Sequence, residues 1–308
     1  MQRSNPAAVV TVPAPAKLNL SLSVLSRRDD GYHAIESLIV PVSLCDTVRV
    51  EATEEPGIRL RVRFGGRLAR AAAGELATDV PVDASNLAVR AAEALAAEAG
   101  LAPAPGLAID LVKRIPSGSG LGGGSSDAAA VLVAAAAAWG MDRSRESLLE
   151  VAASLGSDVP VFVAGGAAVV TGRGERIEPV AGIPPLHAVI ARPSAGLSTA
   201  AVYARCTPDP SRVGTSRLLA EALARGDLRQ ALPLVHNGLE DAARQSCPEV
   251  DRLLGDFARA GAVRPLLTGS GSACFALVRS AAESRLVAAR LRSRGWPAVF
   301  RVRLDPRR

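Results

Sequence analysis

The segment from residue 116 to residue 126 has the residue types of a site that could bind phosphate. It reads PSGSGLGGGSS, and it runs directly into Asp127. Glycine permits positive φ and a close approach of the backbone, and the serine pair can cap a helix. The first turn of such a helix directs free N–H groups at whatever the loop encloses. The segment therefore predicts an anion site, most readily one for phosphate.

A flexible linker is the alternative, because tracts of glycine and serine commonly join domains. The flanking sequence argues against it. Leu107 to Ile115 alternates as a strand does, and Ala128 to Ala138 is an apolar, alanine-rich segment with the length of a helix. A strand, a glycine loop and a helix in this order form a phosphate cradle.

Other nucleotide-binding motifs share this outline. The Walker motif needs a lysine after the glycines, and none follows them here. A GxGxxG pattern exists formally at Gly118, Gly120 and Gly123, but a single match is weak evidence. A nicotinamide oxidoreductase stays an alternative, but it would need an acidic residue at the end of a second strand to bind the ribose. The sequence shows none there, because Asp142 follows the alanine-rich segment in a loop.

Composition narrows the class of protein. The chain has 308 residues, enough for two domains, and 48% of them are hydrophobic. No apolar run is long enough to cross a bilayer and the start has no signal-peptide core, so we expect no membrane partner and a cytoplasmic location. The net charge is +6, but the arginines are scattered, which favours anionic substrates over nucleic acid.

Cysteine and lysine usage give two further expectations. The four cysteines lack metal-ligand spacing, so we expect buried, reduced thiols and no resident metal site. Of 36 basic residues only Lys17 and Lys113 are lysines. Because the chain uses arginine for almost every other cation, both lysines are candidates for a specific role.

Short alternating segments in the first half predict an antiparallel sheet of separate strands. They are Ala7 to Val12, Leu18 to Leu25, Ser37 to Val42, Thr47 to Glu51 and Ile58 to Phe64. Gly65 to Thr78 is a connection without a clear pattern. Ser85 and Asn86 predict the cap of a helix that ends at Gly100, and another helix is expected over Arg143 to Leu155.

The second half begins after the turn around Gly172 and Gly174, which predicts domains over residues 1–175 and 176–308. Two short apolar segments, Val159 to Val163 and Ala167 to Thr171, precede this turn. The C-terminal pattern of strand, glycine turn, strand, helix and strand predicts a split β-α-β unit, so the second domain is expected to be ferredoxin-like.

Three segments in the same order resemble the signature motifs of the GHMP small-molecule kinases. They are PAKLNL at residues 15–20, PSGSGLGGGSSDAA at 116–129 and LTGSGSACF at 267–275. The resemblance implies an α+β protein with a two-domain GHMP kinase fold, in which a ribosomal-protein-S5-like β/α domain precedes a ferredoxin-like domain. It also implies ATP and Mg²⁺ as cofactors, and either a monomer or a homodimer.

Four more segments resemble those GHMP kinases that phosphorylate a cytidine diphosphate ester of methylerythritol in the non-mevalonate isoprenoid pathway. They are DDGYHAIESL at 29–38, NLAVRAAEAL at 86–95, LGSDVPVFVAGG at 155–166 and HNGLEDAA at 236–243. A kinase for homoserine or mevalonate is the nearer alternative, and a non-catalytic nucleic-acid module a more distant one. One departure concerns the glycine loop, where Ser119 stands at a position often held by Gly or Ala.

The resemblance assigns roles residue by residue. Lys17 matches the cation that stabilises the transferred charge, and Asp158 matches the base that orients and deprotonates the hydroxyl. On local pattern alone, Asp158 would be a helix cap or a turn residue. The residues implied for ATP binding are Asn86, Pro116, Ser117, Gly118, Ser119, Gly120, Leu121, Gly122, Gly123, Gly124, Ser125 and Ser126.

The residues implied for the acceptor include both tyrosines of the chain. Tyr32, His33 and Tyr203 match positions that hold the cytosine, although each aromatic alone would more often be structural. The remaining residues implied for substrate binding are Asn19, Thr268, Gly269, Ser270 and Gly271. For Ser125 and Ser126, phosphate or magnesium contact and simple helix capping stay open as alternatives, and Asp127 is expected to act mainly on the helix dipole.

Overall fold

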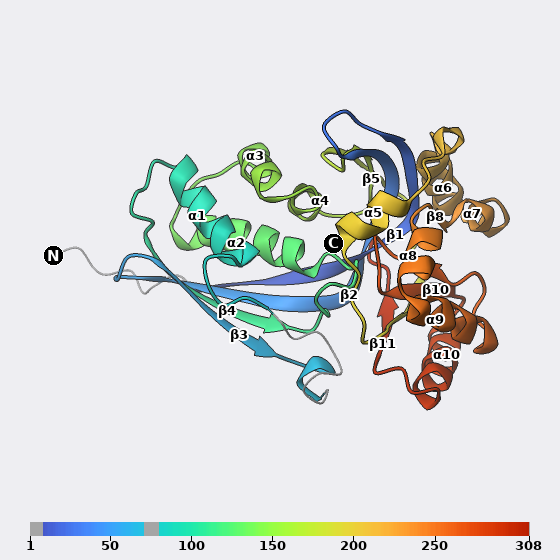
Figure 1. The fold of residues 1–308 in the computed structure, drawn as a ribbon. Coiled ribbons are helices and arrows are strands. Elements are labelled where there is room, and N and C mark those ends of the chain that lie inside the picture. Colours follow the sequence, from blue (N-terminus) through green and yellow to red (C-terminus); the bar gives the residue numbers. More distant parts are fainter. Residues whose placement is uncertain (1–8, 71–79, 308) are drawn as a thin grey trace.

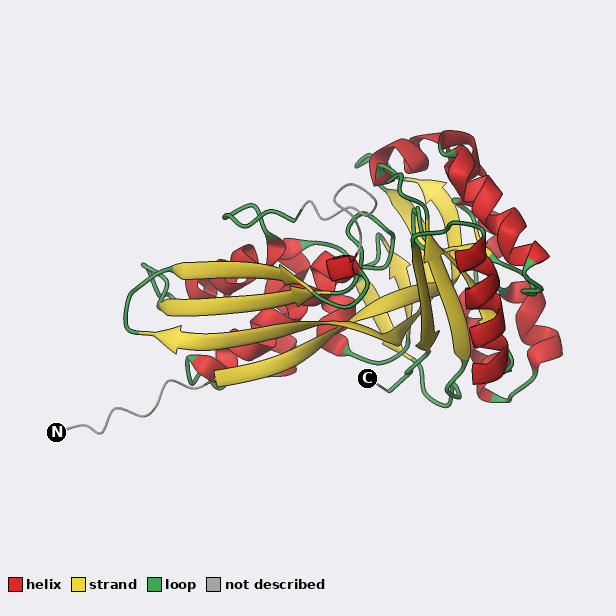
Figure 2. Ribbon diagram, turned by 90° about the horizontal axis from the view of Figure 1, so that it is seen from below, coloured by secondary structure: helices red, strands yellow, loops and turns green. Residues whose placement is uncertain are grey.

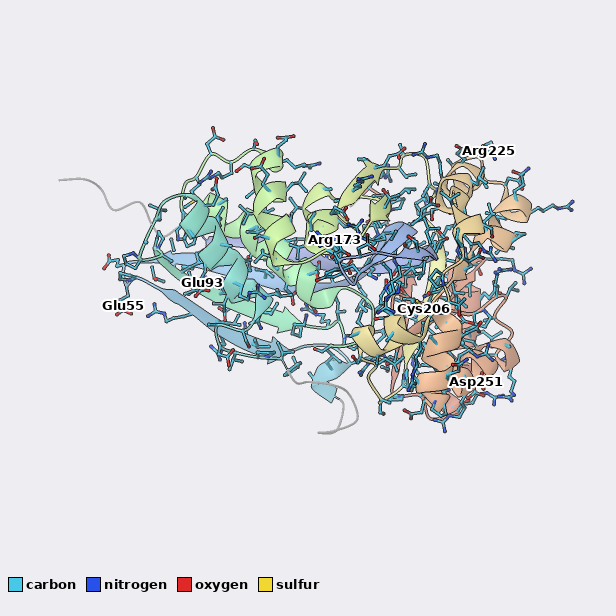
Figure 3. The ribbon with its side chains drawn as sticks, turned by 45° about the horizontal axis from the view of Figure 1, so that its top comes forward. Glu55, Glu93, Arg173, Cys206, Arg225 and Asp251 are labelled. Carbon is cyan, nitrogen blue, oxygen red and sulfur yellow. The ribbon has the colours of Figure 1, made fainter. Side chains whose placement is uncertain are left out.

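The computed structural model describes residues 9–70 and 80–307, which form two sheets with helices packed against them (Figure 1). The predicted connection over Gly65 to Thr78 lies partly outside the described residues. Its described part contains a short 3-10 turn, η1 (Leu68–Arg70). Charged side chains cover the outside from Glu55 at one end to Arg225 and Asp251 at the other (Figure 3).

The first sheet has the order β3-β4-β2-β1-β8, and β5 and β6 extend it beside β2. Its strands are β1 (Val9–Arg27), β2 (His33–Thr53), β3 (Ile58–Phe64), β4 (Gly106–Lys113), β5 (Ala168–Gly172), β6 (Arg176–Pro179) and β8 (His236–Asn237). β3 runs parallel to β4 and β8 runs parallel to β1, whereas the other pairs are antiparallel.

The prediction of separate short strands in the first 53 residues was wrong, because β1 and β2 are each continuous. Proline misled it. At Pro13 and Pro15, β1 pairs only with β2 within the described residues. The other edge of β1 has no strand there, so the missing proline N–H groups remove no hydrogen bond to a second neighbouring strand. Pro41 lies between the stretches of β2 that pair with β5 and with β4. Irregularities in register, one of them between Pro15 and Lys17, absorb the local distortion.

Helices cover one face of this sheet (Figures 1 and 2). They are α1 (Leu87–Glu98), α2 (Gly123–Ala138), α3 (Arg145–Leu155) and α4 (Val159–Ala164). The alanines of α2 permit close packing on all sides, and eleven of its residues are buried. The apolar segment after Asp158 is the helix α4, with Pro160 in its first turn, where a missing N–H has no cost.

The second sheet has the order β11-β7-β10-β9, with every pair antiparallel. Its strands are β7 (His187–Arg192), β9 (Leu266–Leu267), β10 (Cys274–Val278) and β11 (Ala298–Arg303). Numbered in chain order this is 4-1-3-2, and α10 (Ala281–Ser293) links the last two strands. The predicted split β-α-β unit and ferredoxin-like class are confirmed.

The remaining helices belong to the second half of the chain. They are α5 (Thr199–Arg205), η2 (Pro210–Arg212), α6 (Thr215–Ala224), α7 (Leu228–Leu234), α8 (Glu240–Ser246) and α9 (Pro248–Arg259). Helices α9 and α10 lie on the outer face of the second sheet, and Phe257 of α9 is fully buried there (Figure 2).

The two sheets share a hydrophobic core. Leu18 and Leu20 of β1 pack in one cluster with Ile190, Phe275 and Phe300 of the second sheet. Because successive side chains in a strand point to opposite faces, Lys17 before these leucines and Asn19 between them point the other way. The shared core thus fixes the direction in which Lys17 and Asn19 point.

Three further expectations concern the whole chain. The division at residues 175 and 176 stays a prediction, and the strand that follows it, β6, pairs with β5. Within the described residues, no helix combines the length and the apolar character needed to cross a membrane. All four cysteines are thiols, but Cys45 and Cys206 are only partly buried, so the expectation of four buried thiols holds for Cys247 and Cys274 alone.

Candidate active site

The glycine loop ends in a left-handed residue that starts a helix. Gly122 has φ 73° and is the N-cap of α2, and its carbonyl accepts the N–H of Ser126 at 2.9 Å. The serine pair therefore does not cap the helix, because both serines lie inside its first turn. Ser126 is buried, and its hydroxyl has no hydrogen-bond partner in the described part of the chain, whereas Ser125 faces the cavities on both sides of the loop.

The loop is fixed by backbone contacts to two distant segments. The carbonyl of Leu121 accepts the N–H of Lys17 at 3.0 Å, and the carbonyl of Ser119 accepts the N–H of Ala273 at 3.1 Å. The Ser119 hydroxyl donates to the carbonyl of Pro116 at 2.7 Å, inside the loop itself. A serine at this position is thus accommodated by an internal hydrogen bond.

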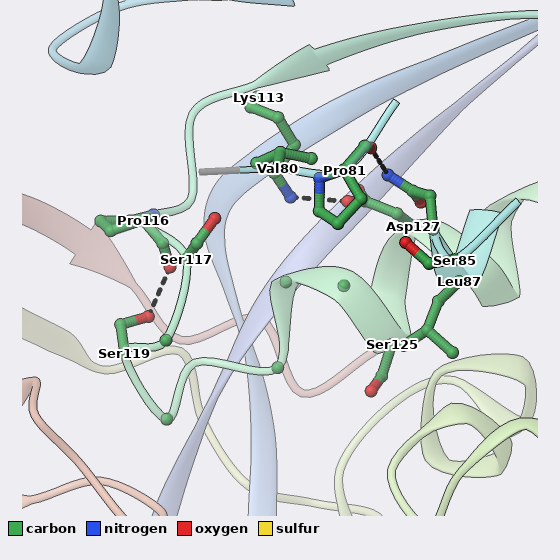
Figure 4. A pocket seen from close by; sticks show the side chains of 16 residues that line it. Val80, Pro81, Ser85, Leu87, Lys113, Pro116, Ser117, Ser119, Ser125 and Asp127 are labelled. Atoms are coloured by element: carbon green, nitrogen blue, oxygen red, sulfur yellow. Dashed lines mark hydrogen bonds and ion pairs between the residues drawn. The ribbon is translucent and has the colours of Figure 1, made fainter. Parts of the chain in front are cut away.

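One cavity of about 360 Å³ lies between the loop and the start of α1 (Figure 4). Asn86 is the N-cap of α1 and accepts the N–H of Ala88 at 2.9 Å, as the sequence predicts. Its side-chain nitrogen donates to the carbonyl of Pro81, which also lines the cavity. The capping function and a place beside a ligand are therefore compatible for Asn86.

Lys113 lines this cavity and contacts two acidic side chains, of which Figure 4 shows Asp127. Its Nζ lies 2.5 Å from Asp127 and also pairs with Asp46, and all three side chains are buried. Burial lowers the Lys113 pKa, but the two carboxylates outweigh it and the net direction is upward. Burial, only partly opposed by Lys113, raises the pKa of Asp127 to about 8. Asp127 therefore ties α2 to the sheet through its close contact with Lys113, which its sequence position did not reveal.

A second cavity, of about 690 Å³, lies on the other side of the loop. Gly118, Gly120, Gly122 and Ser125 line both cavities. The glycine loop is thus a common wall between a smaller chamber and a larger one. This arrangement suits two molecules that react with one another across the loop.

Lys17 and Asp158 both line the larger cavity. The Lys17 Nζ donates to Asn19 Oδ1 at 2.5 Å, and Asn19 Nδ2 donates to Ser37 Oγ at 2.8 Å, which fixes the amide orientation. Burial lowers the Lys17 pKa, and the negative charge of Asp158 opposes that shift. Asn19 therefore positions the ammonium group as well as lining the cavity.

Asp158 is not used as a helix cap. It precedes α4 in the N-cap position, but its side chain makes no capping hydrogen bond. The capping alternative suggested by its sequence position is not realised, and its carboxylate is left for the cavity. The neighbouring Ser157 lines the cavity too.

The aromatic residues predicted for the acceptor all line the larger cavity. The rings of His33 and Tyr203 are 5.2 Å apart between centroids, and Tyr32 is 56% exposed. The Arg173 guanidinium lies 5.1 Å from the Tyr32 ring centroid. Burial, together with the charge of Arg27, lowers the pKa of His33, so its ring is neutral at neutral pH.

Two charged residues of the larger cavity were not predicted from the sequence. Arg27 and Arg173 line this cavity and give it positive charge. An arginine between Gly172 and Gly174 was available as a signal, but those glycines were interpreted only as a domain boundary. The rarity of lysine in this chain made Lys113 a candidate for a specific role. Its partners could not be predicted, because Asp46 and Asp127 lie far from each other in the sequence.

The second glycine turn closes the larger cavity. Gly269, Ser270 and Gly271 line it, whereas Thr268 is fully buried and accepts the N–H of Asn19 at 3.1 Å. Leu121 and Ser126, also predicted for ligand contact, are likewise buried behind the walls. Asn237 Nδ2 donates to the carbonyl of Gly269 at 2.8 Å, which gives the HNGLE segment a positioning role.

The residues present fit a magnesium ion that arrives with phosphates better than a resident metal. Within residues 9–70 and 80–307, no group of three or more His, Cys, Asp or Glu could hold a metal ion. Mg²⁺ commonly takes one or two protein ligands and completes its shell with phosphates and water. The Ser125 hydroxyl, which faces both cavities, is an oxygen suited to that role.

Comparison with known proteins indicates the family of this chain. Family models for the GHMP kinases N terminal domain and the GHMP kinases C terminal domain match residues 86–166 and 219–297. The chain is 42% identical over 302 residues to the 4-diphosphocytidyl-2-C-methyl-D-erythritol kinase of Rhodococcus jostii, covering 96% of this chain and 93% of that protein. The chain belongs to the 4-diphosphocytidyl-2-C-methyl-D-erythritol kinase family of GHMP kinases.

Further relatives agree with this assignment. The GHMP kinase described here is 39% identical to a protein of the same name from Mycobacterium tuberculosis, over 98% of this chain and 92% of that one. A crystal structure of 4-(cytidine 5'-diphospho)-2C-methyl-D-erythritol kinase superimposes with a TM-score of 0.75 at 37% identity, covering 96% and 99% of the two chains. A homoserine kinase from Cytophaga hutchinsonii, with a TM-score of 0.71 at 20% identity and coverage of 99% and 96%, shares the fold. This GHMP kinase is an ATP-dependent small-molecule kinase.

Proposed function

We propose that this kinase transfers the γ-phosphoryl group of ATP to a hydroxyl of 4-diphosphocytidyl-2-C-methyl-D-erythritol. The observation that carries the proposal is the glycine loop shared by two cavities, with Lys17 and Asp158 beside it. The names of the relatives above point to the same acceptor. The location expected for such a biosynthetic reaction is the cytoplasm.

ATP would lie in the smaller cavity, with its phosphates on the glycine loop and its base beside Asn86. The N–H groups at the start of α2 and the dipole of this helix, which begins at Gly123, favour negative charge there. The left-handed residues Gly118, Gly120 and Gly122 let the backbone curve around the phosphates. Mg²⁺, held by Ser125 and the phosphates, would neutralise charge as the terminal phosphoryl group departs.

The acceptor would fill the larger cavity. A cytosine ring can stack among Tyr32, His33 and Tyr203, since every base has a π face. A neutral His33 offers one N–H donor and one acceptor nitrogen to the pyrimidine edge. Arg27 and Arg173 supply positive charge on the side where a diphosphate bridge would pass.

The chemical step needs one base and one fixed cation. The acceptor hydroxyl oxygen forms a bond to the γ-phosphorus while the bond from that phosphorus to the bridging oxygen breaks, and ADP leaves with the electron pair. The hydroxyl proton passes to Asp158. In a loose transition state this proton transfer is late, so a weak base suffices. The buried Lys17 ammonium stabilises the negative charge on the phosphoryl oxygens.

An assay of ATP consumption with three acceptors tests this proposal. The cytidine diphosphate ester, homoserine and mevalonate are offered separately at equal concentration. Turnover of the ester alone is the expected result. Turnover of homoserine or mevalonate in its place would overturn the choice of acceptor.

A further inference from the structure

A third cavity, of about 320 Å³, lies where the two domains meet, and it shares no lining residue with the two described above. Four of its lining residues are arginines from four different segments. Arg67 follows β3 and Arg114 follows β4 in the first domain, whereas Arg292 lies in α10 and Arg301 in β11. The fold thus gathers four cations that are far apart in sequence.

No carboxylate lines this cavity, and within the described part of the chain none of the four arginines takes part in an ion pair. Arginines elsewhere in this protein do have acidic partners, as in the pairing of Arg244 with Asp251. Burial lowers the pKa of Arg292, and the positive charges of Arg67 and Arg301 lower it further. As far as the described residues go, the cluster therefore carries like charge that no acidic side chain compensates.

Two of the guanidinium groups are held in place by the protein. Arg292 donates one N–H to the carbonyl of Val299 at 3.0 Å, while its buried Nε has no hydrogen-bond partner among residues 9–70 and 80–307. Arg114 donates to Thr47 Oγ1 at 2.8 Å. These hydrogen bonds fix the direction of each guanidinium group before any ligand arrives.

The structure assigns to this cavity a binding site for a compact anion with more than one negative charge, of the diphosphate class. Arginine suits this role because its planar fork of donors matches phosphate oxygens in pairs. The volume limits the ligand to a small molecule. Other lining residues include Ser43, Leu44 and the buried Val299 and Phe300, so the site is a cavity and not a flat basic surface for a polymer.

Calorimetric titration with inorganic diphosphate tests the site directly. The protein is titrated with saturating ADP present and without magnesium, which the probe would chelate. The double variant Arg67→Gln, Arg301→Gln removes two exposed charges that make no hydrogen bond of their own within the described residues. We expect it to bind diphosphate at least tenfold more weakly than the unaltered protein, and inorganic phosphate to bind more weakly than diphosphate in both.

A matched control is the double variant Arg229→Gln, Arg285→Gln, which removes the same charge from exposed positions elsewhere. It should bind diphosphate within twofold of the unaltered protein. Equal binding by both double variants would place the anion elsewhere and overturn the assignment.

Thermal unfolding gives an independent readout. Diphosphate should raise the Tm of the unaltered protein and of the control, but not that of the Arg67→Gln, Arg301→Gln variant. Without ligand, this variant should melt no lower than the unaltered protein, because like charges have been removed. An unchanged Tm of the unaltered protein on adding diphosphate would contradict the proposal, whatever the kinase assay shows.

Discussion

Gly120 faces the main-chain oxygen of Thr268 so closely that a β-carbon at residue 120 would lie 2.2 Å from it. This contact joins the glycine loop of the first domain to the second glycine turn. The same is true in the opposite direction, because a β-carbon added to Gly269 would lie 2.9 Å from the Gly120 carbonyl oxygen. The two turns can approach only as bare backbone, and this approach closes the wall of the larger cavity.

Replacing Gly120 by alanine should destabilise the protein more than the same change at Gly118. Both glycines have positive φ, which costs alanine about 1 to 2 kcal/mol. A β-carbon on Gly118 meets nothing within 4 Å, so that variant should lose no more than this strain. Gly120→Ala should lose about 1 to 3 kcal/mol in addition, from the clash with Thr268. Denaturant unfolding measures both, and equal losses would contradict the packing argument.

Asp158→Asn and Lys17→Ala should each reduce kcat strongly while the protein stays folded. Removal of a positioned base typically costs about 10²- to 10⁴-fold. Steady-state kinetics with the cytidine diphosphate ester, together with a thermal melt, measures the effect. Asp142→Asn, an exposed change in a loop, is the matched control. Near-normal turnover in both active-site variants would remove Asp158 and Lys17 from the mechanism.

Tyr32→Ala should raise the KM for the ester and leave the KM for ATP unchanged. The ring is largely exposed, so its loss should not unfold the protein, and it lines only the larger cavity. Loss of stacking on one base is worth about 1 to 3 kcal/mol, or roughly five- to 150-fold in affinity. If the KM for the ester did not change, Tyr32 would have no part in acceptor binding.

The KM for the ester should rise as the pH falls into the acid range. The His33 pKa is lowered by burial and by Arg27, so the ring is neutral at pH 7 and gains a proton only below its ordinary pKa of about 6.5. Protonation replaces the acceptor nitrogen by a second donor, which weakens recognition of the pyrimidine edge. His33→Gln should abolish this acid dependence. If the KM of the His33→Gln variant still rose at acid pH, a group other than His33 would be responsible for the pH dependence.

The Asp127 carboxyl should make the folded protein less stable as the pH rises. Its folded pKa, about 8, lies above the unfolded value of about 3.9, so the native state holds the proton more tightly. Stability from this group is complete below pH 4 and is lost progressively toward pH 8, by at most about 1.4 kcal/mol per pH unit. Asp127→Asn should flatten the curve of unfolding free energy against pH. An equally steep curve in the variant would show that Asp127 titrates normally.

Local pattern in the sequence predicted much of this protein. The helix capped by Asn86, the glycine loop between a strand and a helix, and the final split β-α-β unit all depend on neighbouring residues, so their signals lie within short windows. Three motifs in order were sufficient to indicate the kinase family, which the family models confirm. The motif around Asp158 predicts a catalytic role, which stays a prediction, for a residue whose local position suggested only a cap; the side chain makes no capping hydrogen bond and lines the larger cavity.

Contacts between distant segments were decided by the tertiary structure alone. The continuity of β1 through Pro13 and Pro15 depends on which strand edge lacks a partner, and no local window contains that information. Lys113 lies between Asp46 and Asp127 because two segments meet beneath the loop. The assembly of four arginines at the domain junction has the same origin, since side chains far apart in sequence become neighbours only when the shared core has packed.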